Sequence, residues 1–165
     1  SCKSSNSSKA NTMNIDELRE EIKRDEGSVN SVYLDHLNLP TCGIGHLITE
    51  WDEEYNKPVG TTISEDRVKE LFAKDIEITI SECKELFDTF DDLPEEVQKI
   101  CANMMFNMGR PRLSKFVKFR EAISKSDWLE CAIQMEDSRW HKQVTKRADR
   151  LIKRMEDLGV KEQVA

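Results

Sequence analysis

Residues 24–47 read RDEGSVNSVYLDHLNLPTCGIGHL, and this stretch decides the expected fold. It contains two short runs of β-favouring residues, 31–34 and 41–46, with glycine, proline and asparagine around them. Runs of this kind between turn-forming residues are typical of short strands joined by tight turns. The sequence therefore predicts a small antiparallel sheet between about residues 28 and 49.

Apolar residues at helical spacing flank this sheet on both sides. We expect a helix over 14–26, because Asn14 is a suitable N-cap and Gly27 is suited to end it. A second helix is expected to begin at Ser64 and to run to about residue 80. The clearest helical spacing follows Pro94 and continues up to Gly109.

Three more helices are expected near the C-terminal end of the chain. They begin near Pro111, Ser126 and Thr145, and Gly159 is expected to end the last one. The expected fold class is therefore α+β, mainly α, with one small antiparallel sheet.

Composition bounds the class of protein. The 165 residues are 38% hydrophobic and 35% charged, which suits one domain with its own core. No apolar run approaches the roughly 18 residues of a membrane helix, so we expect no membrane insertion. Residues 1–13 are rich in Ser, Lys and Asn and are expected to form a flexible tail before a single domain over 14–165. The tail is either a linker or what remains after a signal peptide is removed.

Charge is distributed unevenly along the chain. The net charge is −7, with 16 acidic and 5 basic residues between positions 50 and 96 but 15 basic and 9 acidic residues after them. An acidic balance argues against nucleic acid as a partner, because neutralising phosphates requires a basic surface. The basic C-terminal part can still attract an acidic polymer.

Five cysteines form neither a C-x-x-C pair nor a cluster with histidine, so we expect no zinc site. No other metal and no organic cofactor is implied by the sequence. They are Cys2, Cys42, Cys83, Cys101 and Cys131. The last three lie in helical patterns, where a free buried thiol is the expected state. Disulfides stay open as an alternative if the protein is secreted.

Glu26 is unusual because its spacing from Ile22 and Leu18 places a carboxylate on the apolar face of the first helix. Burial disfavours the charged form of a carboxyl group, and a general acid must hold its proton near neutral pH. Asp35 follows nine residues later in the strand region, where aspartate is disfavoured unless it bounds a turn or has a function. Paired carboxylates are the catalytic groups of glycosidases. The alternative is that Glu26 is exposed at the helix end and serves solubility alone.

Asp75 faces inward from the middle helix, and a buried carboxylate needs a partner. His46 is the candidate, and we favour a structural ion pair over part of a hydrolytic triad. No serine stands in a G-x-S-x-G setting to act as the nucleophile. Gly43 and Gly45 lack the third glycine of a nucleotide-binding motif, and we expect them to allow a tight turn and close approach of the backbone to a ligand.

Together, these residues resemble the lysozymes of T-even bacteriophages and their relatives. The resemblance begins at residues 24–27, continues through 33–35 and 41–47, and keeps the family's spacing of nine and six residues between its Glu, Asp and Thr. Residues 102–109 are similar to the helix that lines the family's cleft, and residues 138–140 with 146–148 are similar to its C-terminal signature.

The resemblance covers about residues 14–158 and implies an inverting hydrolase of bacterial peptidoglycan. It implies that Glu26 is the general acid, Asp35 the second carboxylate, and Thr41 the residue that positions the attacking water. The bond cut would be the β-1,4 link from N-acetylmuramic acid to N-acetylglucosamine, which leads to lysis of the bacterial cell. The family's fold implies two lobes, about 14–63 and 81–165, joined by a helix over 64–80, with the active site between them.

The resemblance also implies binding and supporting residues. Substrate-binding positions are Leu47, Phe106, Asn107 and Arg139. His46 with Asp75 resembles a buried salt bridge, and Arg147 resembles a partner that orients Glu26 and favours its charged form, which opposes the effect of burial.

The expected protein is a monomer that acts outside the cytoplasm, either secreted or associated with a phage. Two alternatives stay open. One is a non-catalytic glycan-binding module, such as a structural piece of a phage tail, and the other is an enzyme whose substrate is chitin.

Overall fold

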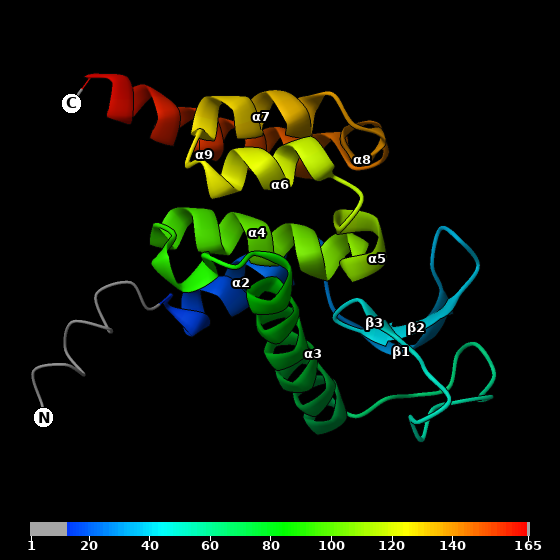
Figure 1. The fold of residues 1–165 in the computed structure, drawn as a ribbon. Coiled ribbons are helices and arrows are strands. Elements are labelled where there is room, and N and C mark those ends of the chain that lie inside the picture. The colour runs from blue at the N-terminus through cyan, green and yellow to red at the C-terminus, as the bar shows by residue number, and fades with distance from the viewer. Residues whose placement is uncertain (1–12, 165) are drawn as a thin grey trace, which may run out of the picture. The chain divides into compact units, whose positions relative to one another are not determined.

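The computed structural model of the chain describes residues 13–164 (Figure 1). It confirms an α+β fold, mainly α, with one three-stranded antiparallel sheet. Most of the predicted tail, residues 1–12 with Cys2, lies outside the described residues. The described chain divides into two compact units: Arg19–Ile78, here the sheet unit, and residues 13–18 with 79–164, here the helical unit.

The sheet lies where the sequence predicts it. Its strands are β1 (Val29–Leu34), β2 (Pro40–Gly43) and β3 (His46–Leu47), and they are neighbours in that order. The outer edge of β1 is covered by residues 60–63, because Ser31 bridges to Thr62 and the amide of Val32 donates to the carbonyl of Thr61 at 2.9 Å. This cover pairs backbone groups that an open edge would leave exposed.

Helix α2 (Ile15–Glu26) confirms the predicted first helix. The side-chain oxygen of Asn14 accepts a hydrogen bond from the amide of Glu17 at 3.2 Å, which caps the helix start. Gly27 has a φ of 75°, a conformation that glycine adopts without strain, and it ends the helix. Glu26 is therefore the last residue of α2 and is followed directly by the turn into β1.

Helix α3 (Glu65–Leu86) begins as predicted but does not end at about residue 80. The apolar face that carries the buried residues Ile76 and Thr79 continues at Cys83, whose side chain is fully buried. No glycine or proline interrupts the segment after residue 80. The helix therefore continues to Leu86, because its apolar face still packs against buried side chains beyond residue 80.

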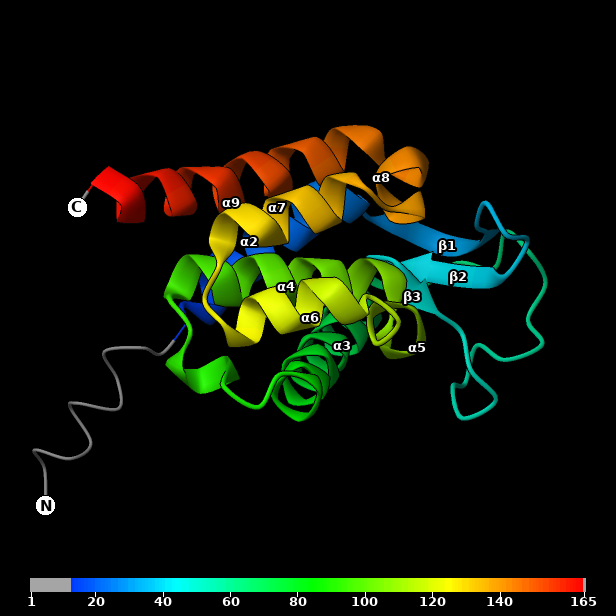
Figure 2. The ribbon, with the colours of Figure 1, turned by 45° about the horizontal axis from the view of Figure 1, so that its top comes forward.

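The remaining helices belong to the helical unit. Their bounds are η1 (Phe90–Asp92), α4 (Glu95–Met108), α5 (Arg110–Leu113), α6 (Val117–Ser124), α7 (Trp128–Glu136), α8 (Arg139–Gln143) and α9 (Thr145–Val164). The helix expected near Pro111 is thus two short helices. Helix α7 packs against both α6 and α9, and Figures 1 and 2 show the three side by side.

The prediction that Gly159 ends the last helix is wrong, because α9 continues to Val164. A Cβ atom on Gly159 would lie 2.5 Å from Cγ of Leu129 in α7 and 3.0 Å from its backbone nitrogen. Glycine is thus needed at this position because α9 passes very close to α7. Sequence alone does not distinguish a glycine that permits close packing from one that ends a helix.

Cys42, Cys83, Cys101 and Cys131 are free and buried. For the three helical positions this confirms the expected state, in which the thiol acts as a small apolar side chain. Within residues 13–164, no helix combines the length and apolar character needed to cross a membrane.

Candidate active site

Glu26 lies at the junction of α2 and β1 and is partly buried. Its carboxylate packs against the turn between β2 and β3. A Cβ atom built on Gly45 would lie only 2.6 Å from Oε1 of Glu26 and 3.0 Å from its Cδ. The carboxylate therefore lies directly on the backbone of Gly45. The absence of a side chain at position 45 is what allows Glu26 to approach the backbone so closely.

Asp35 follows the last residue of β1 and is held by the turn that it bounds. Its Oδ1 accepts hydrogen bonds from the amides of Leu37 at 2.8 Å and Leu39 at 2.9 Å. The backbone amide of Asp35 donates in turn to the carbonyl of Leu39 at 3.0 Å. These bonds fix the orientation of the carboxylate, since rotation about its side chain would break two of them.

Thr41 lies in β2 and is only 4% exposed. Its hydroxyl donates to the carbonyl of Leu39 at 2.9 Å. A hydroxyl that donates its single proton in this way still has lone pairs that can accept a hydrogen bond, for instance from a water molecule. The donor bond to Leu39 fixes the direction in which those lone pairs point.

The strand register places three side chains next to one another on one face of the sheet. Thr41 is directly opposite Tyr33 in β1 and Leu47 in β3, and residues opposite each other share a face. Leu47 is 49% exposed, so it offers apolar surface to a ligand on this face. The sequence-predicted residues Thr41 and Leu47 are thus brought together.

Tyr33 is a site residue that sequence reasoning missed. Burial, together with the negative charges of Glu26 and Asp35, raises the pKa of its phenol above the usual value. Both carboxylates therefore lie close enough to Tyr33 for their charges to act on its phenol. The period of two along a strand was the available signal, because it places Tyr33 on the same side as Asp35.

His46 is held between two carboxylates. Its Nδ1 lies 2.7 Å from Oδ2 of Asp75 in α3, and its Nε2 lies 2.7 Å from Oδ2 of Asp52. Burial disfavours the charged ring, but the hydrogen bonds and charges of Asp75 and Asp52 outweigh it and raise the pKa of His46. Since both ring nitrogens are engaged, neither can accept a proton from a nucleophile, and the arrangement is that of a structural ion pair rather than a hydrolytic triad.

Cys42 is next to Thr41 but is not suited to act as a nucleophile. Burial, together with the nearby charges of Glu54 and Asp52, raises the pKa of its thiol to about 11. The reactive form of cysteine is the thiolate, which is scarce at neutral pH for such a thiol.

The other predicted site residues belong to the helical unit. Asn107, at the end of α4, accepts a hydrogen bond from the indole of Trp140 at 2.7 Å. Phe106 is partly exposed beside it. Arg147 in α9 is buried, and its Nε donates to Oδ1 of Asn103 at 2.8 Å. The pairing of Arg147 with Glu26 stays a prediction.

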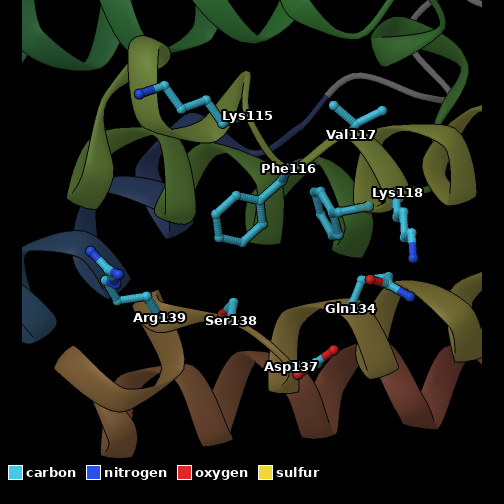
Figure 3. Close-up of a pocket in the computed structure, with 9 residues that line it drawn as sticks. Lys115, Phe116, Val117, Lys118, Gln134, Asp137, Ser138 and Arg139 are labelled. Carbon is cyan, nitrogen blue, oxygen red and sulfur yellow. The ribbon is translucent and has the colours of Figure 1, made fainter.

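Arg139 lines a pocket of about 410 Å³ within the helical unit. The lining residues come from the segment around α6 and from the α7–α8 junction, and they include the cations Lys115 and Lys118. Figure 3 shows the ring of Phe116 in the middle of them. The pocket thus combines an aromatic surface with three cationic side chains and one carboxylate, that of Asp137. The excess of cations suits a ligand that carries both apolar and anionic groups.

Among residues 13–164, no three His, Cys, Asp or Glu side chains are grouped so that they could hold a metal ion. The candidate catalytic groups in the sheet unit are two carboxylates, a phenol and a hydroxyl. Carboxylates can carry proton transfer without a metal, as in glycoside hydrolysis.

Comparison with known proteins identifies the family of this chain. The sequence profile of the family described as phage lysozyme matches residues 23–157. The chain belongs to the phage lysozyme family. The match includes every residue named above as a candidate for catalysis or substrate binding.

Three curated proteins are similar over most of the chain. The probable T4-type lysozyme 2 of Dictyostelium discoideum is 31% identical over 90% of this chain and 98% of its own length. The probable T4-type lysozyme 1 of the same organism is 27% identical over 84% of this chain and 92% of its own length. The pre-baseplate central spike protein Gp5 of Enterobacteria phage T4 is 28% identical over 81% of this chain but only 26% of its own length.

Proposed function

We propose that this lysozyme-family chain is an N-acetylmuramidase, which hydrolyses the β-1,4 link between N-acetylmuramic acid and N-acetylglucosamine in bacterial peptidoglycan. The observation that carries the proposal is the placement of two carboxylates around one small sheet: Glu26 rests on the turn between β2 and β3, and Asp35 is held at the end of β1. Two carboxylates beside one binding surface are the groups that glycoside hydrolysis requires. Cleavage of the glycan strands would weaken the wall and lyse the cell.

In the proposed mechanism, Glu26 protonates the oxygen of the leaving sugar. Asp35 removes a proton from a water molecule, which attacks the anomeric carbon from the opposite face and inverts its configuration. The hydroxyl of Thr41 accepts a hydrogen bond from this water and orients it. The fixed bonds from Leu37 and Leu39 to Asp35 support this role, because a general base must keep its orientation while the water reacts.

Substrate binding is assigned to Leu47, Phe106, Asn107 and Arg139 on the resemblance to the family. The exposed part of Leu47 supports the assignment in the sheet unit. In the helical unit, Arg139 belongs to the pocket with Lys115 and Lys118, and these cations suit the carboxylates of the peptide stems that peptidoglycan carries.

The first test compares how wild type and Glu26→Gln clear a suspension of peptidoglycan. Loss of the proton donor should lower the rate by at least about 100-fold, the contribution typical of general acid catalysis. Glu20→Gln is the matched control, since Glu20 is an exposed residue of the same helix, and it should clear at the wild-type rate. Equal rates for wild type and Glu26→Gln would overturn the enzymatic assignment.

The similarity to Gp5 favours a second candidate function. In this candidate the chain is a non-catalytic part of a virion and binds peptidoglycan. This candidate predicts that wild type binds insoluble peptidoglycan without releasing reducing ends and that Glu26→Gln binds equally. Products released from chitin oligomers but not from peptidoglycan would keep the mechanism and change the substrate. Action outside the cytoplasm and a monomeric state are parts of the main proposal, and sedimentation measurements would test the latter.

A further inference from the structure

We propose that Gly45 is a positioning residue for Glu26, because the bare backbone of the β2–β3 turn is the surface against which the Glu26 carboxylate rests. The inference rests on the proposed function, in which Glu26 is the general acid. It adds that the residue at position 45 sets where the acid can lie, although it contributes no chemical group of its own.

The contact between the two residues is closer than any side chain at position 45 would allow. An ideal Cβ on Gly45 would lie 2.6 Å from Oε1, 3.0 Å from Cδ and 3.3 Å from Cγ of Glu26. A carbon and an oxygen that are not bonded stay about 3.3 Å apart or more. A methyl group at this position would therefore displace the carboxylate by several tenths of an ångström.

The turn is also held by contacts other than the one with Glu26. A Cβ on Gly43 would lie 3.3 Å from Cγ1 of Val68, so the turn is already close to α3. His46, the residue after Gly45, is held by Asp75 and Asp52 at 2.7 Å each. Since these contacts hold the turn in place, we expect the end of the Glu26 side chain to be the group that moves.

Displacement of a general acid affects the rate more than the fold. A shift of about 1 Å in a reacting group can lower the rate by about 100-fold, whereas a carboxylate at the end of a side chain can move with little loss of stability. We therefore expect Gly45→Ala to lower kcat by about 10- to 100-fold while KM changes less than threefold.

The substitution has a second effect, which a matched control removes. Gly45 has a φ of +62°, so alanine is strained there whatever it contacts. Gly60 has a φ of +96°, and no atom lies within 4 Å of the point that a Cβ on it would occupy. Gly60→Ala therefore carries the backbone strain without the contact, and it should lower the melting temperature while kcat stays within twofold of wild type.

The test measures kcat and KM on soluble peptidoglycan fragments for wild type, Gly45→Ala and Gly60→Ala at a temperature where all three are folded. A kcat for Gly45→Ala equal to that of Gly60→Ala would overturn the proposal. Crystal structures supply a readout that does not depend on activity: the Glu26 carboxylate should be displaced in Gly45→Ala and unmoved in Gly60→Ala. An unmoved carboxylate in Gly45→Ala would also contradict the proposal.

Glu26→Asp provides a further test, because it shortens the acid by one methylene group and withdraws it from the contact. In that background Gly45→Ala should lower the remaining kcat less than threefold, and the same fold-loss in both backgrounds would contradict a role through Glu26. A failure of the proposed function would be recognised by a different result from a failure of the Gly45 proposal. If Glu26→Gln is as active as wild type, the assignment of Glu26 as acid is wrong, whatever Gly45→Ala does.

Discussion

Different interactions stabilise each of the two units. In the sheet unit, buried or partly buried charges fix irregular segments: Asp52 pairs with His46, and Glu54, only 5% exposed, pairs with Arg67 at 2.7 Å. In the helical unit the core is apolar and rich in methionine and cysteine, with Met104 and Cys101 fully buried. The helical unit also buries the charged side chains of Lys99 and Arg147. The sheet unit therefore offers the test of a histidine held by charge, and the helical unit the test of apolar packing.

The largest expected effect comes from a substitution that leaves a cavity in the core of the helical unit. Ile100→Ala removes a fully buried side chain of α4 and should lower the free energy of unfolding by about 2–5 kcal/mol. Urea unfolding measures the change. Val160→Ala, at an exposed position of α9, is the control and should stay within about 0.5 kcal/mol of wild type. A loss below about 1 kcal/mol for Ile100→Ala would show that this core is not tightly packed.

Gly159→Ala tests the close approach of α9 to α7. Alanine is the better helix former by about 1 kcal/mol, but its methyl group would meet Leu129 at 2.5 Å. Overpacking of this kind costs about 1–3 kcal/mol. We therefore expect net destabilisation in thermal unfolding, and a stabilised variant would show that the two helices separate easily.

The ion pairs of His46 predict a pH dependence in the sheet unit. The pKa of His46 is raised in the folded protein, so its stabilisation is complete below the pKa of an unfolded histidine, about 6.5. It is lost as the pH rises through the folded pKa. The melting temperature of wild type should fall over this range, and Asp52→Asn should flatten the fall.

The control for the pH experiment is Asp149→Asn in the helical unit. It removes the carboxylate that pairs with His141, and the Asp149 side chain is 61% exposed. Exposed pairs of this kind are worth about 1 kcal/mol or less, so the control should leave the slope close to that of wild type. If Asp149→Asn changed the slope of melting temperature against pH as much as Asp52→Asn does, the proposed difference between the two units would be contradicted.

The smallest expected effect concerns an exposed ion pair. Lys84 and Asp91 are 3.7 Å apart with side chains 53% and 77% exposed. Lys84→Ala should change the free energy of unfolding by about 0.5 kcal/mol or less, since water screens such pairs. A loss above about 1 kcal/mol in urea unfolding would show that this exposed pair contributes more than screening by water allows.

Local signals made a large part of the fold predictable. The cap at Asn14, the positive φ of Gly27 and the short strands each depend on residues close together in sequence. The continuation of α3 to Leu86 and the role of Gly159 depend instead on what those segments pack against. Amino-acid patterns along one segment do not contain that information.

The candidate site shows the same division. Glu26 and Asp35 stood out because carboxylates are unusual on an apolar helix face and in a strand region, and the resemblance to a family gave them roles. Tyr33 could have been found from strand periodicity. Asp52 could not, because it lies in an irregular loop, and its partnership with His46 depends on how that loop folds back.

The central claim is that Glu26 and Asp35 cleave a glycan with inversion. The most direct measurement is NMR of the sugar anomer that wild type first releases from peptidoglycan fragments. A β-1,4 link cut with inversion gives the α-anomer of N-acetylmuramic acid first, followed by its slow conversion to the equilibrium mixture. We expect the α-anomer to appear first. First release of the β-anomer, or of no reducing sugar at all, would contradict it.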